Sequence, residues 1–165
     1  MHVFALSSPR RLFHKISIAL ALVFTLSSPT IHASGGGSSS GITDGQANYF
    51  TLEPAFVANI IDGRKLRYMQ VGLDLMSMDS HAIQAVQDHH APIRHELLML
   101  FTHLEISDVM GMQQREHLRQ EALKRIQDTL LKYAGINSKD KVATDDGKKY
   151  RTGIQEVLFT SFVIQ

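Results

Sequence analysis

The stretch Leu66-Arg-Tyr-Met-Gln-Val-Gly-Leu-Asp-Leu-Met76 decides the fold of this chain. Its residues alternate in polarity, which places two sets on opposite faces: Met69, Val71, Leu73 and Leu75 on one, Tyr68, Gln70, Gly72 and Asp74 on the other. A period of two over this length predicts a half-buried β-strand. Asp62-Gly63 just before it is a strong turn signal, and residues 49–61 read as a preceding strand. We therefore predict an antiparallel hairpin over residues 49–76.

Pro54 lies inside the first strand of this hairpin. Proline has no backbone N–H and cannot donate to a strand ladder. The strand over residues 49–61 is therefore predicted to lie at an edge of the sheet or to be broken at Pro54.

The hydrophobic period changes after this hairpin. Asp79 or Ser80 can cap a helix that runs to about His90, and Pro92 suits the first turn of a second helix. A third and longer helix is predicted over residues 113–134, where apolar side chains recur at helical spacing: Leu118, Ala122, Ile126 and Leu130. Gly135 is the expected stop.

The C-terminal part returns to extended structure. Residues 136–152 are polar and predict either a solvated loop or a longer hairpin arm. Residues 154–165 carry apolar side chains at both parities, which predicts a strand buried on both faces and central in its sheet. Two strands, then helices, then a strand predict a small α+β domain, with helices packed on one face of an antiparallel or mixed sheet.

Length and charge exclude several classes of protein. The chain has 165 residues, the size of one ordinary domain, and a formal net charge of +1. Removing residues 1–33, which hold Arg10, Arg11 and Lys15, leaves 14 basic side chains (17 minus 3) against 16 acidic ones. This balance argues against nucleic-acid binding. The absence of cysteine excludes disulfides, thiolate metal sites and cysteine nucleophiles.

The N-terminus resembles a targeting segment. Basic residues precede an apolar run, Ile16–Leu26, that would span only about 16 Å as a helix, against about 30 Å for a bilayer core. Residues 1–33 are therefore predicted to be a signal peptide or a short membrane anchor. Residues 34–48 are rich in Ser and Gly and predict a flexible linker. Both alternatives place residues 34–165 outside the cytoplasm.

Histidines offer the first candidate chemistry. Six of the nine lie between residues 81 and 117: His81, His89, His90, His95, His103 and His117. They suggest metal binding as an alternative function, but none is spaced i,i+3 or i,i+4 from another, as two ligands on one helix face require. His95-Glu96-Leu97-Leu98-Met99 resembles H-E-x-x-H, yet Met99 stands where the second histidine must be.

No other constellation predicts catalysis. The acidic pairs, Asp145 with Asp146 and Asp74 with Asp79, suit turns or solvated surface, and there is no glycine-rich phosphate loop. We therefore predict no catalytic, cofactor-binding or metal-binding residue and no small-molecule substrate. The pattern is typical of a binding or scaffolding module rather than an enzyme.

Three stretches together resemble the family of flagellar basal-body-associated FliL proteins. They are Tyr49-Phe-Thr-Leu-Glu-Pro-Ala-Phe-Val-Ala-Asn59 with Arg67-Tyr-Met-Gln-Val71, then His90-Ala-Pro-Ile-Arg-His-Glu-Leu-Leu-Met-Leu100, and Val157-Leu-Phe-Thr-Ser-Phe-Val-Ile-Gln165. They occur in the family's order, so the resemblance covers residues 49–165.

The resemblance implies a motor role without catalysis. FliL-like proteins sit in the inner membrane, carry a stomatin-like periplasmic domain, and form rings around MotA/MotB stator units that support stator engagement, torque and motility. Two departures stand out: the family usually has a full transmembrane helix, and its link over 136–152 is usually shorter.

The motif positions of the family that occur here are expected to be structural: Pro92, Arg94, Leu97, Leu98, Phe159, Phe162 and Gln165. Arg94 is the charged member of this set. Two roles remain open for it, an ion pair or helix-end contact and a subunit interface.

Overall fold

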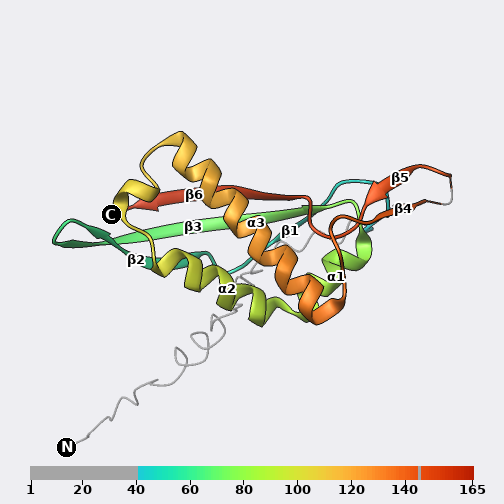
Figure 1. Cartoon of the computed structure of the whole chain (residues 1–165), viewed down its shortest axis with the longest axis horizontal. Helices are drawn as coiled ribbons and strands as arrows, with labels where there is room; N and C mark the ends of the chain where they lie inside the picture. The colour runs from blue at the N-terminus through green and yellow to red at the C-terminus, as the bar shows by residue number, and fades with distance from the viewer. Residues whose placement is uncertain (1–40, 145) are drawn as a thin grey trace, which may run out of the picture. The chain divides into compact units, whose positions relative to one another are not determined.

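The computed structural model describes residues 41–144 and 146–165. The predicted signal or anchor of residues 1–33 and the first part of the predicted linker, 34–40, lie outside the described residues. The elements, shown in Figure 1, are β1 (Asn48–Thr51), β2 (Phe56–Asp62), β3 (Lys65–Ser77), α1 (Ser80–Asp88), α2 (His90–Thr102), the 3-10 turn η1 (Ile106–Asp108), α3 (Met112–Ala134), β4 (Lys141–Ala143), β5 (Lys149–Arg151) and β6 (Glu156–Ile164). The predicted α+β class is confirmed.

The main sheet is built around β3, the long strand that the sequence marks most clearly. β1 and β2 both pair antiparallel with β3, at its residues 74–77 and 65–71 respectively, and β6 pairs with residues 69–76. Since β6 overlaps both registers, β1 and β2 must lie end to end along the opposite edge of β3. The predicted break at Pro54 is confirmed, and Gly63, at φ 61°, makes the turn between β2 and β3.

The prediction that the last strand is central is wrong. Among the described strands β6 pairs with β3 alone, so it is an edge strand. Its two-parity apolar pattern comes from a β-bulge: Ser161 lies opposite Gly72, whereas Phe159 lies opposite Leu73. The extra residue, Thr160, reverses which parity faces the helices.

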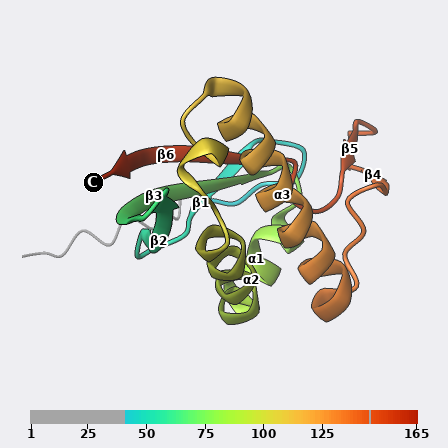
Figure 2. The same cartoon turned by 60° about the vertical axis from the view of Figure 1, so that its left-hand side comes forward.

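The helices cover one face of this sheet. Figure 2 shows α2 and α3 on the same side of β2, β3 and β6, and α2 contacts β2 while α3 contacts β6. Asp79 caps α1, as predicted, by accepting a hydrogen bond from the His81 N–H at 3.0 Å. Gly135 ends α3 in the left-handed region at φ 69°. The core between these layers includes Phe56, Ile60, Leu73, Ile93, Leu97, Phe101, Ile126 and Leu130.

Residues 136–152 form a hairpin arm, the second of the two predicted alternatives, with β4 and β5 as its strands. The chain approaches the domain beside this arm. Asp44 accepts a hydrogen bond from the Ser80 N–H at 2.8 Å, and the Gly45 N–H donates to the Met78 carbonyl at 2.9 Å. The last residues of the predicted linker thus contact the domain.

Candidate functional site

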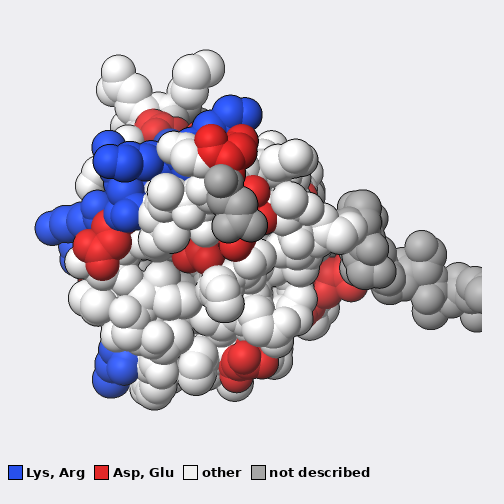
Figure 3. All heavy atoms as spheres, turned by 90° about the vertical axis from the view of Figure 1, so that its right-hand side faces the viewer, with Lys and Arg blue, Asp and Glu red and all other residues white. Residues whose placement is uncertain are grey.

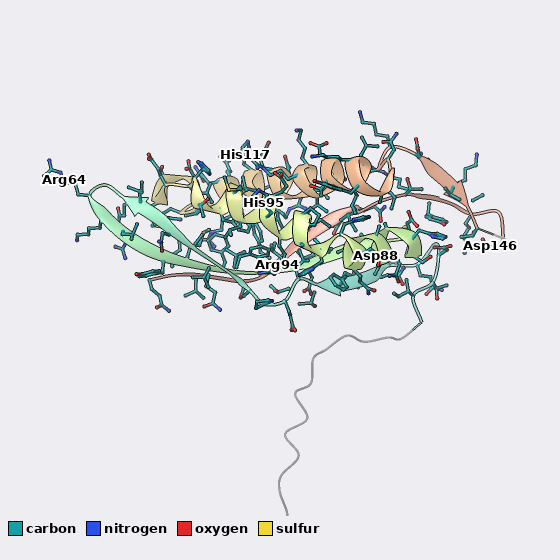
Figure 4. All side chains as sticks on the ribbon, turned by 90° about the horizontal axis from the view of Figure 1, so that it is seen from below. Arg64, Asp88, Arg94, His95, His117 and Asp146 are labelled. Atoms are coloured by element: carbon teal, nitrogen blue, oxygen red, sulfur yellow. The ribbon has the colours of Figure 1, made fainter. Side chains whose placement is uncertain are left out.

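The six histidines are distributed over three helices and their ends. His95 lies on α2 and His117 on α3 (Figure 4), while His103 follows α2 and has its Nδ1 2.6 Å from the Met99 carbonyl. Within residues 41–144 and 146–165, no three His, Cys, Asp or Glu side chains come together as metal ligands would. The metal-binding alternative therefore gains no support from the described residues.

The acidic residues singled out in the sequence hold the fold together or lie on its surface. Asp79 is 5% exposed, and its Oδ2 accepts a hydrogen bond from the Gly153 N–H at 3.1 Å. Asp146 lies at the tip of the β4–β5 arm, where its hydrogen bond with Thr144 lowers its carboxyl pKa. Asp74 lies on β3, on the sheet face turned away from the helices.

That second sheet face is the most unusual surface of the described part of the chain. The strand registers place on it a set of exposed apolar side chains that we call the open face: Tyr49, Val57, Ile61, Leu66, Tyr68 and Val163. Leu66 lies directly opposite Ile61, and Gln70 lies between Val57 and Val163. Apolar side chains therefore occur on β2, β3 and β6, with the polar side chains of Gln70 and Asn59 among them.

The open face carries little charge. The strand positions on this face hold two Asp or Glu side chains, Asp74 and Glu156, and no Lys or Arg, and neither carboxylate lies beside the Leu66–Ile61 pair. Leu66, Tyr68 and Val57 are each more than half exposed, at 59%, 58% and 59%. An exposed apolar surface of this kind marks a site of protein–protein contact more often than a catalytic site.

Arg94 lies on the helix side of the sheet and has a structural contact. Its Nη1 donates to the Pro54 carbonyl at 2.8 Å, and its guanidinium carbon lies 4.3 Å from the centre of the Phe56 ring. The side chain therefore ties α2 to the break between β1 and β2. The first role predicted for Arg94 was an ion pair or a helix-end contact. The observed partner of Arg94 is a backbone carbonyl and not a carboxylate, so the contact is not an ion pair.

Two residues of the C-terminal motif, Phe159 and Phe162, also lie on the helix side of the sheet. Phe159 and Phe162 pack partly buried against the core with ring centres 5.5 Å apart, and the Arg115 guanidinium carbon lies 5.2 Å from the centre of the Phe162 ring. The Phe-x-x-Phe spacing puts both rings on the helix side because the bulge at Thr160 lies between them. Leu98, by contrast, is 42% exposed on α2.

Comparison with known proteins decides the family. The model of the flagellar basal body-associated protein FliL family matches residues 49–165, from β1 to the end of β6. The chain belongs to the FliL family. The description of this family associates it with the flagellar basal body.

A curated relative supports this assignment. The chain is similar to the flagellar protein FliL of Aquifex aeolicus, strain VF5, with 26% identity over 116 residues. The match covers 70% of this chain and 60% of the relative's length. The family is one of flagellar accessory proteins and is not known for enzymatic activity.

Within the described residues of this FliL-family chain, no helix combines the length and apolarity needed to cross a bilayer. The sequence predictions did not single out the open face. A partial signal for this face was present in the sequence. In residues 57–61, apolar side chains occur on both faces of the strand, and Leu66 and Tyr68 put apolar or aromatic side chains on the less buried face of the next strand.

Proposed function

We propose that this chain is a non-catalytic component of the flagellar motor that associates with MotA/MotB stator units and supports stator engagement, torque and motility. Family membership supports the motor association. The single observation that carries a binding role is the open face, a sheet surface with exposed aromatic and aliphatic side chains and little charge.

We propose further that a second copy of the chain covers the open face in a ring-shaped homo-oligomer. Interfaces between identical subunits are more apolar and poorer in charged residues than transient ones. Leu66, Ile61 and Tyr68 fit that composition. A closed ring repeats one such contact around its axis.

Self-association is testable with charge on the open face. In the full-length chain, Leu66→Asp with Tyr68→Asp should weaken the oligomer at least tenfold, because each aspartate would be desolvated in the contact. Leu131→Asp with Tyr133→Asp is the matched control on α3, since these side chains are 51% and 50% exposed. Cross-linking in the envelope reads the outcome. Equal oligomer yields from both double variants would contradict self-association through this face.

The proposed location is the periplasmic face of the inner membrane at the basal body. Residues 1–33 would act as an anchor, or would be removed as a signal peptide and leave a soluble periplasmic subunit. Intact mass of the chain extracted from its native envelope separates these alternatives, because cleavage removes residues 1–33. A stomatin-like arrangement of residues 49–165 belongs to the same proposal and follows from the family resemblance.

The motor role is tested by deletion. A strain without the chain should assemble filaments in normal number but swim more slowly, with the largest loss in viscous medium, where each motor needs most stators. Expression of the full-length chain should restore speed. Unchanged swimming in viscous medium, or loss of filaments, would contradict a stator-support role.

A further inference from the structure

The β4–β5 arm has two sides with different chemistry. One side lines a concavity of about 840 Å³ together with acidic residues from the rest of the domain, Asp44 and Asp79 among them. Val142 and Tyr150 line this side. The basic residues Lys141, Lys149 and Arg151 do not line it, and we call these three the basic side of the arm.

The basic side brings like charges together. Lys141 lies directly opposite Arg151 in the two-stranded ladder, and Lys149 is two residues before Arg151 on the same strand. All three are exposed, and none makes an ion pair with any carboxylate of residues 41–144 and 146–165. Figure 3, which faces the end of the molecule that carries β4 and β5, shows Lys and Arg atoms gathered on one side of this end, with Asp and Glu atoms beside them.

Such an arrangement opposes folding of the arm. Like charges directly opposite each other destabilise a strand pair, and a two-stranded ladder is only marginally stable by itself. The arm is held by contacts elsewhere: Tyr150 is 8% exposed, and the Arg151 Nη2 donates to the Ser138 carbonyl at 3.3 Å. An anionic surface against Lys141 and Lys149 would remove the repulsion between the cations.

The position of the arm indicates which anionic surface it meets. The chain enters the domain beside the arm, because Thr43, Asp44 and Gly45 line the same concavity as Val142 and Tyr150. Residues 34–42, between the predicted anchor and Thr43, span at most about 32 Å when fully extended. In a domain anchored through residues 1–33, Thr43 and the arm beside it can therefore be no further than about 32 Å of extended chain from the end of the anchor.

We propose that the basic side of the β4–β5 arm binds the anionic phospholipid headgroups of the membrane that holds the chain. This deepens the proposed function and rests on its membrane association. Lysine ammonium groups on long flexible stems suit a diffuse layer of headgroups better than one fixed partner. The electrostatic contribution is about fivefold in binding for each cation near such a surface.

The test uses the full-length chain, whose lack of cysteine permits one labelled position. Ala143→Cys, opposite Lys149, carries a fluorophore, and the vesicles carry a quencher on a fraction of their headgroups. Vesicles of phosphatidylcholine alone are compared with vesicles containing phosphatidylglycerol. The label should be quenched on the anionic vesicles, weakly on the neutral ones, and less as salt is raised.

Charge reversal gives the matched comparison. Lys141→Glu with Lys149→Glu should lower the ratio of docked to undocked arms by about 25-fold or more. Arg64→Glu with Lys65→Glu makes the same change of charge at the β2–β3 turn and should leave quenching unchanged. Figure 4 shows Arg64 and Asp146, which mark these two sites, at opposite ends of the domain.

Each contrary result has a distinct meaning. A chain that stays on both kinds of vesicle with an unquenched label overturns the proposal and leaves membrane association intact. Equal quenching on both kinds of vesicle overturns it too, because the arm would then lie near the bilayer without recognising its charge. A chain that binds neither kind overturns both the proposal and the membrane association.

Discussion

At the scale of single residues, a small buried polar junction joins three parts of the chain. The Ser77 hydroxyl donates to the Gly153 carbonyl at 2.7 Å, and the Asp79 N–H donates to that hydroxyl at 2.9 Å. Asp79 in turn accepts hydrogen bonds from the N–H groups of His81 and Gly153. The end of β3, the start of α1 and the approach to β6 therefore depend on one carboxylate.

Asp79→Ala should destabilise the domain by about 2–4 kcal/mol. It removes a helix cap, worth about 1 kcal/mol, and leaves the buried Gly153 N–H without a partner, which costs about 1–3 kcal/mol. Urea denaturation of the full-length chain measures the change. Asp88→Ala, at the exposed end of the same helix, should stay within about 0.5 kcal/mol. Similar losses for both variants would show that Asp79 is an ordinary surface residue.

Glu116 on α3 should have a pKa far below the ordinary value for a glutamate. A hydrogen-bonded ion pair with Arg119, and a further hydrogen bond from Gln120, lower its pKa from 4.5 to about 2. Because the folded-state pKa is lowered, any stability from this pair is complete above pH 4.5 and is lost as pH falls toward 2. Solvent screening keeps that contribution small.

Carbon NMR of the Glu116 carboxyl measures this pKa directly. In Arg119→Met the titration midpoint should return toward 4.5, because the first and largest cause of the shift has been removed. A midpoint near 4.5 in the unchanged chain would refute the ion pair in solution.

At the scale of elements, periodicity predicted most of the fold, and a bulge explains the main error. Residues 66–76 and 113–134 each keep one period throughout, so strand and helix were both predicted correctly. In β6 the extra residue, Thr160, moves the buried set from Val157 and Phe159 to Phe162 and Ile164. When the buried side chains of a strand change from odd to even positions at a bulge, the strand shows apolar residues at both parities. A strand buried on both faces shows the same pattern. Only the pairing with β3 distinguishes the two.

The candidate site was less predictable than the fold. Tyr68 was assigned correctly to the less buried face of its strand, whereas Leu66 was assigned to neither face. The sequence of one strand does not show which side chains the neighbouring strands place beside it. The open face exists because Ile61 lies opposite Leu66, and because Val57 and Val163 lie on either side of Gln70, in two other strands. A single strand can show that apolar side chains lie on its second face, but not which side chains the pairing places beside them.

The connection from β5 to β6 should tolerate no side chain at Gly153. Its φ is +70°, and an added Cβ would lie 2.6 Å from the Ser138 Oγ and 3.2 Å from the Ser138 Cα. Gly153→Ala should therefore cost about 3 kcal/mol, by backbone strain and by overpacking against a buried neighbour.

Gly147→Ala is the control for this prediction. Gly147 has a similar φ of +81° and nothing within 4 Å of an added Cβ among the described residues, so the cost should be about 1 kcal/mol. Thermal unfolding of both variants gives the comparison. Equal midpoints would mean that the contact with Ser138 does not contribute.

At the scale of the whole molecule, the described domain has a four-stranded main sheet with its helices on one side and a separate two-stranded sheet, β4–β5. The core lies between β3 and the helices α2 and α3, while the opposite sheet face carries exposed apolar side chains. The basic side of the β4–β5 arm forms a second surface, at the end where the chain enters. We propose that these two surfaces have different partners: the open face contacts protein, and the basic side of the arm contacts the membrane.

The measurement that tests the central claim most directly is motor torque in cells at high load. Rotation of a bead on a single filament is recorded in a strain whose only copy carries Leu66→Asp with Tyr68→Asp. We predict fewer speed steps per motor and lower torque than with Leu131→Asp and Tyr133→Asp, at equal protein levels and equal filament number. Full torque and a normal number of steps with the open-face variant would contradict the account.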